Sequence, residues 1–171
     1  MPEPVLVPPA SLAALEREQL AAALRPLWED AGPLVDHLAG RRFSSWQGLV
    51  DEAERQIAAM SGPERVALLA AHPRIGAPLV ALAARSQISL AEQGGAAGAD
   101  PEVLAELDAL NDRYEERFGF PFVAWVAGRS RREMTVVIED RLGHDRDTEL
   151  AAGCSALVAI ARDRLSTIGV A

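Results

Sequence analysis

Residues 71–93, AHPRIGAPLVALAARSQISLAEQ, join the predicted end of one helix to the predicted start of another. Pro73 ends the first helix, because a proline disfavours the helical conformation in the residue before it. Ser89 and Glu92 form the Ser-x-x-Glu pattern of a capping box, which predicts a helix start. His72 and the Ser89 group therefore lie at helix ends, and we expect the rest of the chain to form a scaffold around them.

These polar residues have two interpretations. His72 can cap the last carbonyls of its helix, or it can exchange a proton, because a helix C-terminus favours the imidazolium near neutral pH. Ser89 and Glu92 can form a cap and nothing more. Alternatively, Glu92 and Gln93 sit beside the free N–H groups of a helix N-terminus, which suits an anionic ligand. The local pattern leaves both interpretations open.

The composition favours helices. The chain has 171 residues, of which 49% are hydrophobic and only 5% aromatic, with alanine and leucine prominent. Alanine and leucine are strong helix formers, and this length suits one domain with a real core. We predict an extended N-terminal arm at residues 1–10 and a single all-α domain at residues 11–171.

Charge and segment patterns exclude several classes of protein. A net charge of −8 argues against a nucleic-acid binder, although a few arginines can still make a local site for an anionic small molecule. No apolar run approaches the ~20 residues of a membrane span, and the N-terminus does not resemble a signal peptide. The single cysteine, Cys154, is predicted to be a core thiol. We expect a cytoplasmic protein.

Helix boundaries follow from capping and proline signals. We expect broken helices to about residue 38, then helices at 44–60 and 61–71, the former opened by the Ser44-Ser-Trp-Gln47 capping pattern. Asp100-Pro101-Glu102 begins a helix that Gly119 can end. Asp147 or Thr148 is predicted to cap the last helix, whose apolar stripe is formed by Leu150, Cys154, Leu157, Ala161 and Leu165. Residues 94–99, GGAAGA, are either a cover for the site or a plain loop.

One segment remains ambiguous. The apolar residues 120–126 and 134–138 are compatible with a β-hairpin, and periodicity does not decide such short runs.

Three motifs together resemble the OHCU decarboxylase family, which acts on 2-oxo-4-hydroxy-4-carboxy-5-ureidoimidazoline in urate breakdown. They are HPRIG at 72–76, Ser-x-x-Glu-Gln at 89–93 and LNxxYxxRFGFPFV at 110–123, in the family's order and at about its spacing. The similarity extends from about residue 27 to the C-terminus. It implies an all-α domain of seven to eight helices and replaces the hairpin by an extended segment followed by a helix at 131–142.

The resemblance also implies a cofactor-free decarboxylation that yields (S)-allantoin, with no metal. His72 and Glu92 are then the catalytic residues, with His72 as proton donor. The implied substrate-binding residues are Pro73, Ser89, Gln93, Phe122, Val123, Ala124, Trp125, Val126 and Arg164.

The remaining charged residues that are candidates for the site each have more than one interpretation. Arg164 matches a family arginine that suits a substrate carboxylate, and it is also compatible with a solvated arginine at a helix end; Arg162 is the substitute if the register differs. His144, where the family usually has Asn, is predicted to be a surface loop residue, and His37 is predicted to be structural. His72 and Glu92 are too few for a metal site.

Two other functions remain open: a helical interaction module without catalysis, and a lyase or hydrolase on another cyclic ureide. The expected partner is an anionic small-molecule substrate, with no nucleic acid and no membrane. The sequence leaves the oligomeric state open, with a homodimer among the alternatives.

Overall fold

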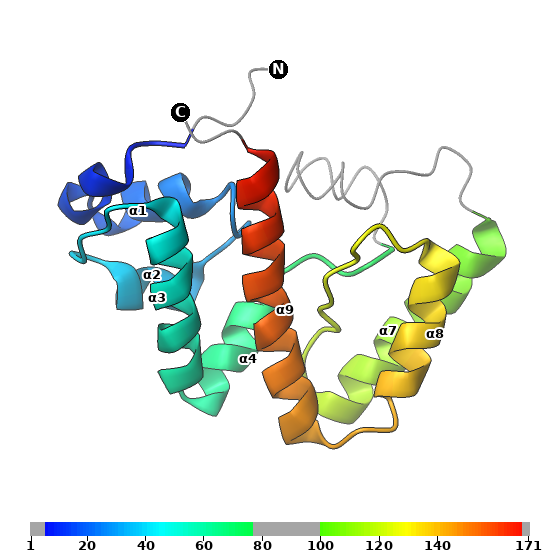
Figure 1. Ribbon diagram of the computed structural model, residues 1–171. Coiled ribbons are helices and arrows are strands. Elements are labelled where there is room, and N and C mark those ends of the chain that lie inside the picture. The colour runs from blue at the N-terminus through cyan, green and yellow to red at the C-terminus, as the bar shows by residue number, and fades with distance from the viewer. Residues whose placement is uncertain (1–5, 77–99, 169–171) are drawn as a thin grey trace.

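The computed structural model describes residues 6–76 and 100–168, and all the regular structure in those two ranges is helical. Figure 1 shows the long helix α9 running through the middle of the molecule, with the N-terminal helices on one side and a helical pair on the other. The helices are η1 (Pro9–Ala14, a 3-10 helix), α1 (Arg17–Leu24), α2 (Gly32–Leu38), α3 (Trp46–Ala59), α4 (Gly62–Ala70), α7 (Pro101–Phe118), α8 (Arg131–Arg141) and α9 (Arg146–Thr167). This confirms the predicted all-α class, and the two described ranges hold eight helices, against a predicted total of seven to eight for the chain. The predicted boundary at residue 10, between an N-terminal arm and the helical domain, remains a prediction.

The helix α9 organises the core because α3 and α4 pack against it, while α7 packs against α8. Its predicted stripe faces the core: Leu165 is partly buried, and four residues are at most 6% exposed, namely Leu150, Cys154, Leu157 and Ala161. The closest approach is at Gly153, where an added Cβ would lie 2.9 Å from Cδ1 of Leu69 on α4. Glycine therefore lets α4 lie against α9, and α4 carries His72 at its end.

Two predicted caps are wrong by one to three residues. The N-cap of α3 is Ser45, not Ser44, because the Ser45 hydroxyl accepts the N–H of Gly48 at 3.0 Å. The last helix begins at Arg146 and its N-cap is Asp145, since that carboxylate accepts both the N–H and the hydroxyl of Thr148, at 2.9 and 2.6 Å. These two hydrogen bonds make Asp145 the cap and place Asp147 and Thr148 inside the first turn of the helix.

The β-hairpin alternative is wrong. Residues 134–138 lie in α8, which a capping box between Ser130 and Glu133 opens. Residues 121–126 run without regular structure between α7 and α8, and Gly119 ends α7 in a left-handed conformation, with φ of 78°. Capping therefore decides the structure where hydrophobic periodicity does not.

Candidate functional site

His72 lies directly after the end of α4, as predicted. The helix ends at Ala70, and the backbone N–H of His72 still bonds to the carbonyl of Leu69 at 3.0 Å. The next residues turn away and are fixed to α7: Arg74 bonds to Glu115 at 2.6 Å, and the Asn111 amide donates to the Ile75 carbonyl at 3.0 Å. The backbone on both sides of the histidine is therefore held in place.

The His72 ring is paired with a carboxylate that the sequence did not indicate. Nδ1 of His72 lies 3.2 Å from Oε2 of Glu29, and the two side chains are 9% and 4% exposed. The other oxygen of Glu29 accepts a hydrogen bond from Nη2 of Arg164 at 2.7 Å, and Nη1 of Arg164 donates to the Leu27 carbonyl at 3.0 Å. Glu29 thus joins the histidine to the buried arginine of α9.

The charges around Glu29 keep it ionised. Burial by itself raises the pKa of Glu29, but the interactions with His72 and with the Arg164 guanidinium together hold the pKa well below its usual range. The ionised carboxylate therefore sits against the His72 ring with its charge balanced by the Arg164 guanidinium. The ring is also oriented, because its Nδ1 side faces Glu29, and Nε2 is the ring nitrogen left for other partners.

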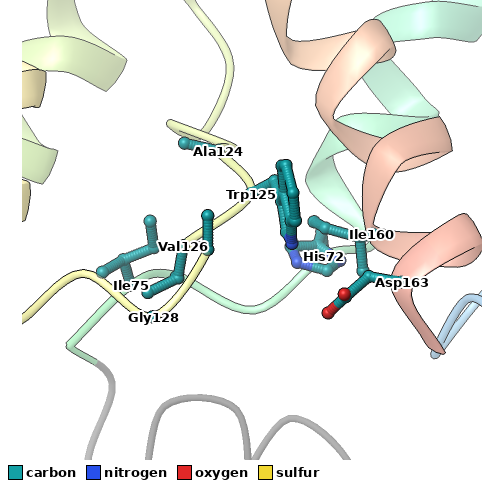
Figure 2. Close-up of a pocket in the computed structure, with 9 residues that line it drawn as sticks. His72, Ile75, Ala124, Trp125, Val126, Gly128, Ile160 and Asp163 are labelled. Carbon is teal, nitrogen blue, oxygen red and sulfur yellow. The ribbon is translucent and has the colours of Figure 1, made fainter. Parts of the chain in front are cut away.

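His72 lines a cavity of about 300 Å³ between α9 and the segment that precedes α8. Figure 2 shows the His72 ring beside the Trp125 indole, with Asp163 of α9 on one side and Ile75, Ala124 and Val126 on the other. The full lining is His72, Ile75, Ala124, Trp125, Val126, Ala127, Gly128, Ile160 and Asp163. The site therefore combines one imidazole, one carboxylate, apolar walls and a stretch of irregular backbone.

The structure brings only part of the predicted site together. His72, Ala124, Trp125 and Val126 line the cavity. Pro73, Phe122 and Val123 are buried and do not line it. Ser89, Glu92 and Gln93, and the GGAAGA stretch, lie outside the described residues.

The structure distinguishes between the two candidate arginines, Arg164 and Arg162. Arg164 is 2% exposed and reaches His72 through Glu29. Arg162 points elsewhere, since its guanidinium bonds to Asp51 and Glu54 on α3, at 3.0 and 2.8 Å. Arg164 is therefore the arginine associated with the site.

The other two histidines take part in ion pairs away from the cavity. His37 lies 3.2 Å from Glu64 at the start of α4, and His144 lies 2.7 Å from Glu149 on α9. His144 has a half-exposed side chain, but its partner Glu149 is fully buried. His37 therefore has a structural contact, as predicted, and His144 is exposed in a loop, as predicted, but it also pairs with a buried carboxylate.

Two site residues could not be found from the sequence. Glu29 lies in the connection between α1 and α2, and its partners come from α9 and from the end of α4. Asp163 precedes Arg164 near the end of α9. Neither belongs to a local motif, so only the tertiary structure identifies them.

The family model described as OHCU decarboxylase matches residues 13–166 of the chain. The chain belongs to the OHCU decarboxylase family. This confirms the resemblance carried by the three motifs, and with it the predicted enzyme class, a carboxy-lyase of urate degradation.

Curated relatives agree with the family. The chain is 31% identical over 159 residues to the 2-oxo-4-hydroxy-4-carboxy-5-ureidoimidazoline decarboxylase of Halalkalicoccus jeotgali, an alignment that covers 91% of this chain and 88% of that protein. It is 28% identical over 157 residues to the uric acid degradation bifunctional protein PucL of Bacillus subtilis. That alignment covers 90% of this chain but 31% of PucL, so the chain spans about a third of the bifunctional protein.

Two solved structures share the fold of this chain. A crystal structure of an OHCU decarboxylase in the presence of (S)-allantoin superposes with a TM-score of 0.67 at 18% identity, covering 90% of this chain and 97% of that one. An (S)-allantoin synthase gives a TM-score of 0.66 at 18% identity, over 95% of this chain and 54% of that one. Within the described residues, no helix is both long and apolar enough to cross a membrane.

Proposed function

We propose that this chain decarboxylates 2-oxo-4-hydroxy-4-carboxy-5-ureidoimidazoline to (S)-allantoin and CO2 in the cavity beside His72. The observation that carries the proposal is the pairing of a cavity-lining imidazole with the buried, ionised Glu29. This pair supplies an oriented proton donor at the wall of a cavity of about 300 Å³, which suits a small heterocyclic substrate.

The reaction needs a proton donor on one face of the substrate. When the bond to the carboxylate breaks, CO2 leaves and the electron pair stays behind as a carbanion or enolate-like intermediate. A proton must then reach the ring from one side to give a single enantiomer. His72 donates that proton from Nε2, while Nδ1–H remains directed at Glu29. A positioned acid of this kind contributes roughly 10²- to 10⁴-fold to a rate.

Glu29 and Arg164 act through the histidine. The carboxylate holds the ring in one orientation and stabilises its positive charge. Arg164 in turn holds Glu29 and anchors it to the Leu27 carbonyl. A direct contact between Arg164 and the substrate carboxylate remains a prediction, as do the roles of Pro73, Ser89, Glu92 and Gln93.

The opposite wall binds the flat ring. Backbone groups of residues 124–126 offer hydrogen bonds to an amide-rich heterocycle, and Trp125 and Ile160 provide apolar faces that exclude water. The Asp163 carboxylate can accept N–H groups of the ureido arm. Exclusion of water matters here, because solvent would protonate either face of the intermediate.

The test is a direct assay with freshly made uricase product, generated with the preceding hydrolase. The wild-type chain should produce an excess of (S)-allantoin, measured by circular dichroism of the product against a reaction without the chain. A racemic product formed at the uncatalysed rate would contradict the proposal. The cytoplasmic location and a homodimer also remain proposals, which fractionation and the mass in solution would test.

A further inference from the structure

The wall of the cavity opposite His72 has its carbonyl groups bound by two arginines. Arg129 donates from Nη2 to the Trp125 carbonyl and from Nε to the Val126 carbonyl, both at 3.1 Å. Arg141 donates from Nη1 to the Val123 carbonyl at 3.3 Å. Neither arginine lines the cavity. The guanidinium groups therefore hold these carbonyls from outside the cavity.

The N–H groups of the same peptide units are left without partners in the protein. In the described part of the chain, the backbone N–H groups of Ala124, Val126 and Ala127 donate to no other group. Each belongs to the peptide unit whose carbonyl an arginine holds. No peptide bond here is cis, and in a trans peptide the N–H points away from the C=O. Fixing the carbonyls outward thus fixes these donors on the opposite side, toward the cavity.

The bound guanidinium also strengthens these donors. A cationic donor on the carbonyl oxygen draws electron density from the peptide unit, and hydrogen bonds in such chains reinforce one another. The carbonyls of residues 123, 125 and 126 are all held by these two guanidinium groups. The wall consequently presents donors rather than an equal mixture of donors and acceptors.

Arg141 is itself fixed by contacts of its own, and the exposed Arg129 spans a turn. Arg141 is paired with the fully buried Glu149 at 2.7 Å and lies over the Phe122 ring at 4.8 Å from its centroid. Arg129 closes the turn in which Ala127 has a φ of 52°, a left-handed conformation that is unusual for a residue with a Cβ. Such strained backbone persists only where surrounding contacts hold it. The two hydrogen bonds from the Arg129 side chain supply part of those contacts.

We propose that Arg129 and Arg141 are positioning residues that turn the backbone of residues 123–127 into an array of N–H donors for the oxygen atoms of an anionic, carbonyl-rich substrate. The proposal rests on the proposed function and deepens it, because it names the groups that make this wall selective for acceptor atoms. Neither arginine touches the substrate.

Arg129 is the better residue to test, since removing Arg141 would leave Glu149 buried beside fewer cationic partners. The variants are Arg129→Ala and, as a control, Arg132→Ala; Arg132 is an exposed arginine on α8 whose side chain pairs with Asp100 at 3.3 Å. Arg129→Ala should raise KM about ten-fold, as expected for the loss of roughly one good hydrogen bond, with a smaller change in kcat. Arg132→Ala should leave both constants within two-fold of wild type.

A second measurement separates this inference from the proposed reaction. Titration of the isotope-labelled wild-type chain with (S)-allantoin should move the amide proton resonances of Ala124, Val126 and Ala127 downfield, and Arg129→Ala should weaken that response. If the amides respond but no excess of (S)-allantoin is formed, the inference stands and the proposed reaction fails. Normal turnover with unresponsive amides, or a folded Arg129→Ala variant with wild-type KM, would overturn the inference.

Discussion

Oε2 of Glu29 lies 3.2 Å from Nδ1 of His72, although Glu29 precedes α2 and His72 follows α4. A histidine that only capped its helix would not need a buried carboxylate on its ring. The contact also explains why Glu29 can stay charged at 4% exposure, because Arg164 holds its second oxygen. The structure therefore favours the proton-transfer interpretation of His72 over the capping interpretation.

Replacing Glu29 by Gln should impair catalysis more than folding. The amide keeps the shape of the carboxylate but cannot stabilise an imidazolium, so kcat should fall about ten-fold or more. The matched control is Glu64→Gln, which alters a Glu–His pair at the surface, with His37, and keeps a residue suited to the capping box. Its kcat should stay within two-fold of wild type. Equal effects of the two substitutions on kcat would contradict a role for Glu29 at the site.

Stability should decrease in acid partly because of Glu29. Its pKa in the folded chain lies well below the ordinary value of 4.5, so the unfolded chain binds the proton first. The contribution of Glu29 to the free energy of unfolding is then complete above about pH 4.5 and is lost as the pH falls toward the folded value, by at most about 1.4 kcal/mol per pH unit. Between about pH 5 and 3, the free energy of unfolding measured with denaturant should therefore fall more steeply for the wild type than for the Glu29→Gln variant. If the free energy of unfolding fell equally with pH in both chains, the contribution assigned to Glu29 would be refuted.

The contact between α4 and α9 depends on Gly153. An added Cβ would lie 2.9 Å from Cδ1 of Leu69, a side chain that is fully buried and has little room to move. Gly153→Ala should therefore lower the free energy of unfolding by about 1–3 kcal/mol, as overpacked cores do. Gly62→Ala is the control, because nothing lies within 4 Å of its added Cβ. A Gly153→Ala variant as stable as Gly62→Ala would show that α4 and α9 are not packed this closely.

Cys154 should be unreactive in the folded chain. It is 6% exposed, and burial raises the pKa of its thiol to about 11. Since the thiolate is the reactive form, a thiol reagent at about pH 8 should label the native chain far more slowly than the chain in denaturant. Rapid labelling of the native chain would show that this part of α9 is accessible.

Local signals in the sequence were sufficient for most of the fold. Pro73 ends α4 where expected, and the capping box at Ser130 accounts for α8, which periodicity left ambiguous. The errors at Ser44 and at Asp147 arose because several neighbouring residues were acceptable caps. Only the three-dimensional hydrogen bonds distinguish among them.

Fewer residues of the site than of the fold could be predicted from the sequence. Pro73 marks the position of His72 locally, whereas residues 124–126 could be placed at the site only through the family resemblance, since their apolar pattern also fitted a β-hairpin. Glu29, Asp163 and the two arginines that hold the wall could not, because their significance depends on contacts between segments distant in the chain. A glutamate in a connection between helices resembles any solvated glutamate until its partners are known.

The most direct test of the account is the stereochemistry of product formation by His72→Asn. Asparagine can still donate to Glu29, and Arg164 remains in place, so the variant should fold with a stability within about 1 kcal/mol of wild type. It should nevertheless lose roughly 10²-fold or more in the rate of (S)-allantoin formation, followed by circular dichroism of the product because the substrate also decarboxylates without enzyme. A folded His72→Asn variant that forms excess (S)-allantoin at the wild-type rate would contradict the assignment of His72 as proton donor.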